Sequence, residues 1–362
     1  MSSGFRALAL AATLLVAPPG NAADPPLPAI PDQALLMGVE MGRADVVAYA
    51  LDKGAKADAA DPRGTTALAL AAKSGNEDIV ALLLTRGAAV DMAAKDGSTA
   101  LMQAAQLGNE RIVGRLLAAK ADLGKREARF GNTALMIAAA KAHAAIVAQL
   151  AEAGGVVDDA DTKNGNTPLI LAASNPEDAD AVSELLARGA DPRRATEDGY
   201  TALMAAAEKG TGGAVTLLLE AAKDKRALVR ASASDGRTAL SLAVSGGWIG
   251  IANLLLEQGA DIEARDAGGA TPLHHAVEAD FPGLVVLLLK RGADVDAVNA
   301  RDGNTALMLA ANRGEVEVVQ MLLAAKSRVD IRAKDGWTAL KAAEMIGDDE
   351  IVEILKAAGA KE

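Results

Sequence analysis

The chain has 362 residues, of which 51% are apolar and only 2% aromatic, and it contains no cysteine. Without cysteine there is no thiol nucleophile and no disulfide, so an ordered structure depends on the packing of Ala, Leu, Val and Met. The formal net charge of −11 repels phosphate backbones and anionic membrane surfaces, which disfavours nucleic acid as a partner.

The first 22 residues differ from the rest of the chain. Arg6 gives a short basic start, residues 7–17 form an apolar run of eleven, and residues 18–22 lead to a small residue, Ala22. We interpret residues 1–22 as a secretory signal peptide whose removal changes the net charge from −11 to −12. A membrane span needs roughly 20 apolar residues, so eleven are too few for the alternative, an uncleaved membrane anchor, and we expect no membrane insertion after cleavage. The expected location is the periplasm, or the medium after secretion.

One motif organises the chain from residue 31 to residue 362. Residues 23–30 before it carry three prolines and no period, which predicts an extended lead-in. The motif, clearest in residues 96–105, returns every 33 to 37 residues, and a weaker tenth copy starts near Gln33. Its threonine marks nine copies: Thr66, Thr99, Thr133, Thr167, Thr201, Thr238, Thr271, Thr305 and Thr338. Recurrence at this interval predicts one stacked-repeat domain over residues 31–362, since a single unit cannot bury its apolar face alone.

Each copy predicts two short helices. An Asp-Gly or Asn-Gly turn precedes the threonine, whose hydroxyl is suited to cap the first helix, and a glycine such as Gly108 ends that helix. Four apolar residues of the second helix stand 13, 14, 17 and 18 places after the threonine, as in Ile112, Val113, Leu116 and Leu117. This spacing puts all four on one helical face. The fifth marked copy is longer, and we interpret its basic run, residues 223–230, as a solvated helix end.

The order of turn, helix, glycine break and helix resembles the ankyrin repeat, and residues 269–276, Gly-Ala-Thr-Pro-Leu-His-His-Ala, are the best single match. The resemblance implies an all-α repeat solenoid of about ten stacked repeats, each with paired helices and a β-hairpin-like finger. It also implies that partners bind the concave side, which the finger tips and first helices build. The family's histidine, which ties neighbouring repeats, is kept at His274. Methionine replaces it in several copies, which favours apolar packing there.

Residues suited to catalysis are few. The histidines are His143, His274 and His275, and we interpret His274 as structural because the family places a helix-tying residue there. The Asp158–Asp161 loop looks like a calcium loop, but position five counted from Asp159 is a lysine and position twelve an isoleucine. We therefore expect no enzyme activity, no cofactor and no metal site. The alternative of a different class is a weak metal-dependent hydrolase at the Asp158–Asp161 loop.

Several aromatic and arginine residues stand just before the marker threonines, at positions that the family exposes on its finger tips. Aromatic side chains and arginine are the commonest interface anchors. The predicted partner-binding residues are Arg63, Arg129, Phe130, Tyr200, Arg237, Arg301 and Trp337. The alternative interpretation is that these positions simply face solvent and vary freely.

The signal peptide, the uninterrupted repeats and the scarcity of catalytic residues predict an exported, monomeric, non-catalytic protein-interaction module. Exported ankyrin proteins that this chain resembles are thought to assist or restrain other periplasmic proteins. The resemblance thus implies a partner protein on the concave side, such as a periplasmic enzyme being stabilised. An immunity or inhibitor protein that neutralises a secreted toxin is the alternative.

Overall fold

The computed structural model describes residues 27–176 and 179–361. The predicted signal peptide and the first residues of the predicted lead-in lie outside the described part of the chain. Within it, the regular secondary structure consists of α-helices, labelled α1 to α21, with isolated β-bridges between them. The chain divides into two compact units, one ending at Asn164 and the other beginning at Gly165.

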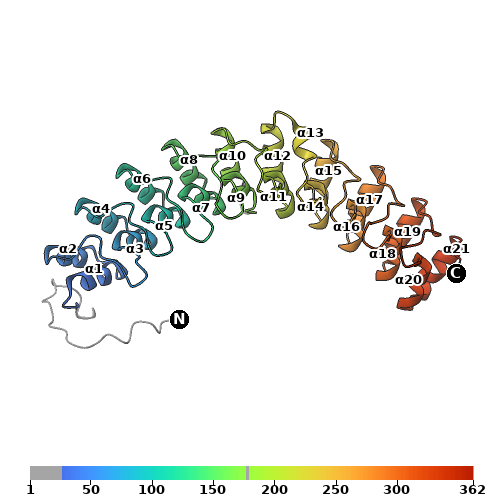
Figure 1. Cartoon of the computed structure of the whole chain (residues 1–362), viewed down its shortest axis with the longest axis horizontal. Helices are drawn as coiled ribbons and strands as arrows, with labels where there is room; N and C mark the ends of the chain where they lie inside the picture. Colours follow the sequence, from blue (N-terminus) through green and yellow to red (C-terminus); the bar gives the residue numbers. More distant parts are fainter. Residues whose placement is uncertain (1–26, 177–178, 362) are drawn as a thin grey trace. The chain divides into compact units, whose positions relative to one another are not determined.

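The first unit is built from helix pairs (Figure 1). The first helices of successive repeats, α1, α3, α5 and α7, pack on one another, and so do the second helices, α2, α4, α6 and α8. Each repeat therefore adds one helix to each of two layers. The bounds are α1 Pro31–Glu40, α2 Ala44–Asp52, α3 Ala67–Ser74, α4 Glu77–Thr85, α5 Ala100–Leu107, α6 Glu110–Ala118, α7 Ala134–Ala140 and α8 Ala144–Glu152.

The second unit repeats the same arrangement. Its first helices are α9, α11, α14, α16, α18 and α20, and its second helices are α10, α12, α15, α17, α19 and α21, each packed on the next of its kind. The bounds are α9 Pro168–Ala173, α10 Asp180–Ala187, α11 Ala202–Lys209, α12 Gly212–Ala221, α13 Lys225–Val229, α14 Ala239–Ser245, α15 Ile249–Glu257, α16 Pro272–Glu278, α17 Pro282–Lys290, α18 Ala306–Arg313, α19 Val316–Ala324, α20 Ala339–Ile346 and α21 Asp349–Ala357. The predicted all-α stacked-repeat fold is confirmed.

The predicted helix signals act locally as expected. The hydroxyl of Thr99 accepts the backbone N–H of Met102, which caps α5, and the same bond recurs at Thr66, Thr133, Thr167, Thr201, Thr238, Thr305 and Thr338. Five first helices end at a glycine with φ between 72° and 76°: Gly75, Gly108, Gly210, Gly314 and Gly347. This left-handed conformation is strained for residues that carry a Cβ, which explains the glycine breaks.

The core runs between the two helix layers. In α6 the side chains of Ile112, Val113 and Leu116 are fully buried, as the spacing predicts. Leu117, the fourth predicted residue, is only half-buried, because it lies at the edge of the apolar face. Alanine fills most remaining interior positions of the first helices, so successive repeats approach closely.

Backbone hydrogen bonds tie the loop before each first helix, the predicted finger, to its neighbour. The amide of Lys95 donates to the Arg63 carbonyl at 3.1 Å, and the amide of Lys334 donates to the Asp302 carbonyl at 2.9 Å. Several fingers are also closed by a single antiparallel bridge that reaches the marker threonine, as at Val298 and Thr305. Each finger is thus held in a fixed place relative to the next one in its unit.

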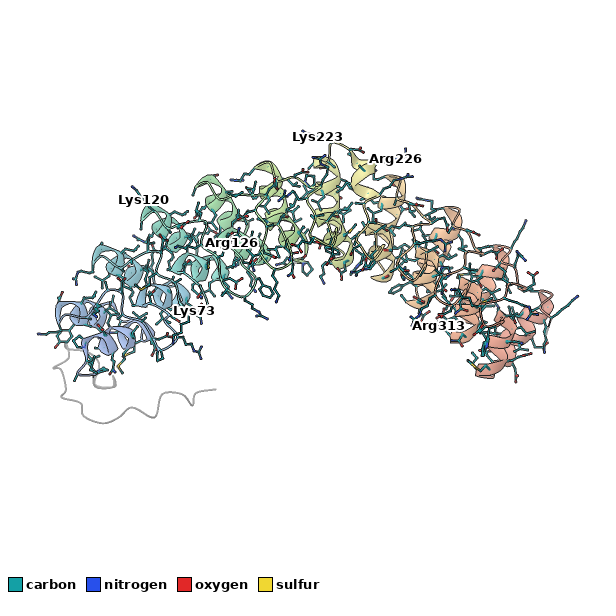
Figure 2. The ribbon with its side chains drawn as sticks, viewed as in Figure 1. Lys73, Lys120, Arg126, Lys223, Arg226 and Arg313 are labelled. Atoms are coloured by element: carbon teal, nitrogen blue, oxygen red, sulfur yellow. The ribbon has the colours of Figure 1, made fainter. Side chains whose placement is uncertain are left out.

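The basic run of the fifth marked copy corrects a prediction. It was expected to be a solvated helix end, but residues 225–229 form a separate short helix, α13, which buries Leu228 and Val229. Its basic side chains are exposed as expected, and Figure 2 shows Lys223 and Arg226 on the side of the second helices. The two apolar residues turn the insertion into a packed helix rather than a loose helix end.

Candidate functional site

The fingers and the first helices form one continuous surface in each unit, which we call the finger face. First helices touch first helices along each unit, and fingers are tied to fingers by their backbones. The backbone that carries the side chains of the finger face is therefore held in place. A surface whose side chains are already positioned loses less conformational entropy when a partner binds.

Phe130 is the aromatic residue of the finger face in the first unit. Its half-buried ring has the Arg129 Cζ atom 4.8 Å from its centroid and the Lys163 Nζ atom 5.0 Å away, so two cations lie against it. The loop is held by the carboxylate of Glu127, which accepts the amides of Arg129 and Phe130 at 2.6 and 2.9 Å. Although burial opposes its charged form, backbone N–H donors, with Asn132 the foremost, keep the pKa of Glu127 below its ordinary value.

Tyr200 lies along α11 in the second unit. Its half-buried hydroxyl donates to the Glu208 carboxylate on the same helix. Burial, followed by this carboxylate, raises the pKa of the Tyr200 hydroxyl, which therefore stays protonated as a donor. The backbone carbonyl of Glu208 accepts the indole N–H of Trp248 at 3.1 Å, which joins the C-terminal end of α11 to the next repeat.

Trp248 was missed among the predicted partner-binding residues. Its side chain is 41% exposed and its neighbour Ile249 is 49% exposed, which leaves an apolar pair at the start of α15. The sequence signal was the rarity of tryptophan, since the chain has two. Trp248 stands in the break between α14 and α15, whereas the predicted residues stand just before a marker threonine.

The remaining predicted residues lie on separate fingers. Arg63 and Arg301 are exposed, and Arg237 is exposed with its Nε atom 2.6 Å from an Asp235 carboxylate oxygen. Trp337 is half-buried and lines a pocket of about 220 Å³. Apart from the adjacent Arg129 and Phe130, each of the seven predicted residues occupies its own finger, so the structure distributes them rather than gathering them into one cluster.

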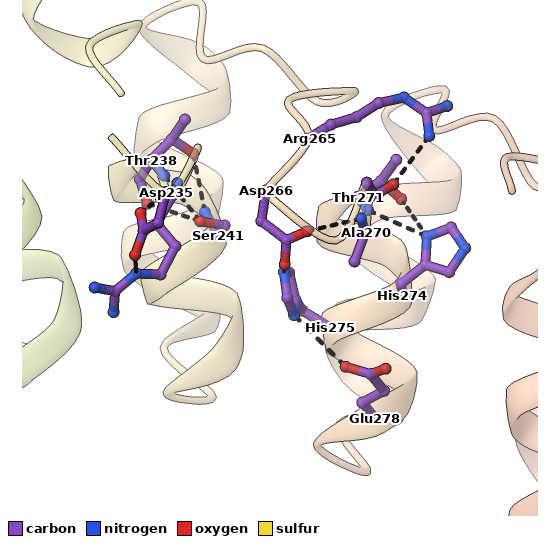
Figure 3. Close-up of polar contacts among 12 residues, drawn as sticks. Asp235, Thr238, Ser241, Arg265, Asp266, Ala270, Thr271, His274, His275 and Glu278 are labelled. Carbon is purple, nitrogen blue, oxygen red and sulfur yellow. Dashed lines mark hydrogen bonds and ion pairs between the residues drawn. The ribbon is translucent and has the colours of Figure 1, made fainter. Parts of the chain in front are cut away.

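The contacts of His274 confirm its predicted structural role, and Figure 3 shows the one with Thr271. His274 is 1% exposed, and its Nε2 atom lies 3.0 Å from the Asn304 carbonyl of the next repeat. Its Nδ1 atom lies 2.8 Å from the Thr271 hydroxyl and accepts the Thr271 backbone N–H at 3.2 Å, so threonine and histidine form a capping box at the start of α16. Burial lowers the pKa of His274, which favours the neutral ring. His275 lies between two carboxylates, 3.1 Å from Asp266 and 3.7 Å from Glu278.

The acidic loop considered as a metal site makes contacts within the protein. Asp159 forms an ion pair with Arg126 at 2.5 Å, and the Asp161 carboxylate is buried, where it accepts the amides of Lys163 and Asn164 at 3.0 and 2.6 Å. Within residues 27–176 and 179–361, no group of three or more His, Asp or Glu residues is placed to hold a metal ion.

Comparison with protein families matches the model described as "Ankyrin repeats (3 copies)" to overlapping segments of the chain. The matched segments are residues 35–127, 101–196, 170–266, 226–299 and 273–361. A search of curated proteins finds no match. No helix of the described residues is both long and apolar enough to cross a membrane.

Proposed function

Because the chain belongs to the ankyrin-repeat family, we propose that it is an exported periplasmic protein that holds a partner protein on the finger face and catalyses nothing itself. Ankyrin repeats are protein–protein interaction modules and generally non-catalytic scaffolds. The predicted signal sequence supports the periplasmic location. The proposed partner is a periplasmic enzyme that is stabilised or restrained by a monomer of this chain.

The observation that carries the proposal is the placement of aromatic side chains on fixed fingers. Phe130, Tyr200 and Trp337 are each half-buried, so each side chain is partly covered by the protein and partly exposed. Partly exposed, pre-positioned aromatic rings are the usual anchors of protein interfaces. Positions that merely face solvent do not need side chains that are held in place.

The test is capture of the partner from the native periplasm with a tagged chain and two variants. Tyr200→Ala and Trp337→Ala are each expected to weaken binding of the captured partner by more than about 1 kcal/mol, or roughly fivefold in Kd. Lys223→Ala and Arg226→Ala, on the side of the second helices, are the matched controls and should bind as the parent does. The affinity of each purified variant for the captured protein is then measured by calorimetry.

Three results decide the proposal. Equal binding by the parent and both aromatic variants removes the finger face as the interface, and absence of any periplasmic partner removes the proposed role. The activity of the captured protein, measured with and without the chain, separates assistance from inhibition. A partner that is a toxin blocked on binding would replace the enzyme-assisting role by the inhibitor role.

A further inference from the structure

The pocket beside Trp337 lies on the finger face between two successive repeats. Its lining residues come from α18 and the finger before it and from α20 and the finger before it, and they include Asn304, Met308, Asn312, Asp335, Trp337 and Ala342. Its volume of about 220 Å³ lies below the range of roughly 300–1,000 Å³ that is typical of sites for small-molecule ligands. A cavity of this size suits one long side chain of a partner rather than a cofactor.

The chemistry of the lining is divided into three parts. The buried side chains of Met308 and Ala342 give an apolar floor, and the indole of Trp337 gives an aromatic wall. Asn304 and Asn312 add amide groups. Asp335 is the charged residue of the lining, so the pocket combines an aromatic face with a negative charge.

Asp335 keeps its charge available. One of its carboxylate oxygens accepts the backbone amide of Trp337 at 3.0 Å, both residues line the pocket, and Asp335 is exposed. Among the described residues, Asp335 takes part in no ion pair. The two cations that precede it most closely in sequence donate to backbone carbonyls, Lys334 to that of Ala300 and Arg332 to that of Gly336.

We propose that this pocket binds an arginine side chain of the partner protein, with the guanidinium on the Trp337 indole and paired with the Asp335 carboxylate. A guanidinium stacks on an indole face and forms a two-pronged contact with a carboxylate, whereas the amine of lysine acts as a point charge. The net charge of −11 favours a basic partner surface as well. This inference rests on the proposed function, because it assigns one contact within the finger face.

The test needs no partner. Trp248→Phe leaves Trp337 as the single tryptophan, so its indole NMR signal reports on the pocket alone. The probes are N-acetyl-arginine amide, N-acetyl-norleucine amide and N-acetyl-glutamate amide, each titrated into the full chain. We expect a saturable shift with the arginine probe, in the millimolar range for so small a ligand, and binding at least tenfold weaker for the other two.

Asp335→Asn is the decisive variant, because Asn retains the oxygen that accepts the Trp337 amide and removes the charge alone. It should weaken the arginine probe at least fivefold and reduce the salt dependence of binding. Asp302→Asn, at the same position of the preceding finger and outside the pocket, is the matched control and should leave binding unchanged.

Two outcomes overturn the inference: a norleucine probe that binds as well as arginine, or an arginine affinity that survives Asp335→Asn. The first result would assign the pocket to an apolar side chain, and the second would show that the Asp335 carboxylate does not pair with the guanidinium. They are distinguishable from failure of the proposed function, which is measured by periplasmic capture. A chain that captures its partner on the finger face but ignores the arginine probe refutes only this assignment.

Discussion

Gly210 is the position where the packing of one repeat on the next can be measured most directly. It ends α11 with φ of 76°, and a Cβ added there would lie 2.4 Å from the Cε2 atom of Trp248. Gly210→Ala therefore has two costs. Left-handed backbone costs a residue with a Cβ about 1–2 kcal/mol, and displacing a packed ring costs about 1–3 kcal/mol more. Displacement would also strain the hydrogen bond from the indole to Glu208.

Gly314 provides the matched control. It ends α18 with φ of 72°, but a Cβ there would meet nothing nearer than a flexible Asp348 oxygen at 3.4 Å. Gly314→Ala should therefore cost only the backbone term, about 1–2 kcal/mol, against about 2–5 kcal/mol for Gly210→Ala. Because a stacked array can unfold in steps, amide hydrogen exchange of α11 and α14, compared with α18 and α20, is the suitable assay.

A double-mutant cycle isolates the part of the Gly210→Ala cost that comes from the Trp248 ring. In a Trp248→Ala background, the cost of Gly210→Ala should fall to that of Gly314→Ala, since the side chain it would strike is gone. If Gly210→Ala costs no more than Gly314→Ala in the parent, or if the cycle shows no coupling, then Trp248 does not pack on Gly210 and the described contact between these repeats is wrong.

Two further predictions concern the core. His274→Met, which installs the residue that other repeats carry, should cost about 1 kcal/mol at neutral pH for the lost bond to Asn304. Burial holds the pKa of His274 below its ordinary value of 6.5, so the unfolded chain binds the extra proton, and the parent's advantage should shrink as pH falls below about 6.5. Urea unfolding at pH 7 and pH 5 checks this, and a pH-independent difference contradicts it. Leu116→Ala, at a position with no exposed surface, should cost about 2–5 kcal/mol by opening a cavity, measured by hydrogen exchange in α6. A loss below about 1 kcal/mol would mean that the repeat collapses around the gap.

Local signals in the sequence determined the helices. A threonine cap at Thr99 and a glycine at Gly108 bound α5 on both sides, and each acts through atoms only a few residues away. The spacing of Ile112, Val113 and Leu116 identified the buried face of α6, because helical geometry alone relates those positions. Repetition of these rules in nine marked copies was sufficient to predict the stacked fold and its family.

The tertiary structure alone decided which side chains meet. Trp248 donates to a carbonyl 40 residues earlier, and Arg126 pairs with a carboxylate 33 residues later, so neither contact follows from the order of residues within one repeat. Composition indicated a solvated basic helix end at residues 223–230. The helix α13 forms there instead, because Leu228 and Val229 are buried by packing. The pocket beside Trp337 exists because two repeats supply its walls. Contacts of this kind depend on how far each repeat is shifted against its neighbour, and that shift arises from the combined packing of both repeats.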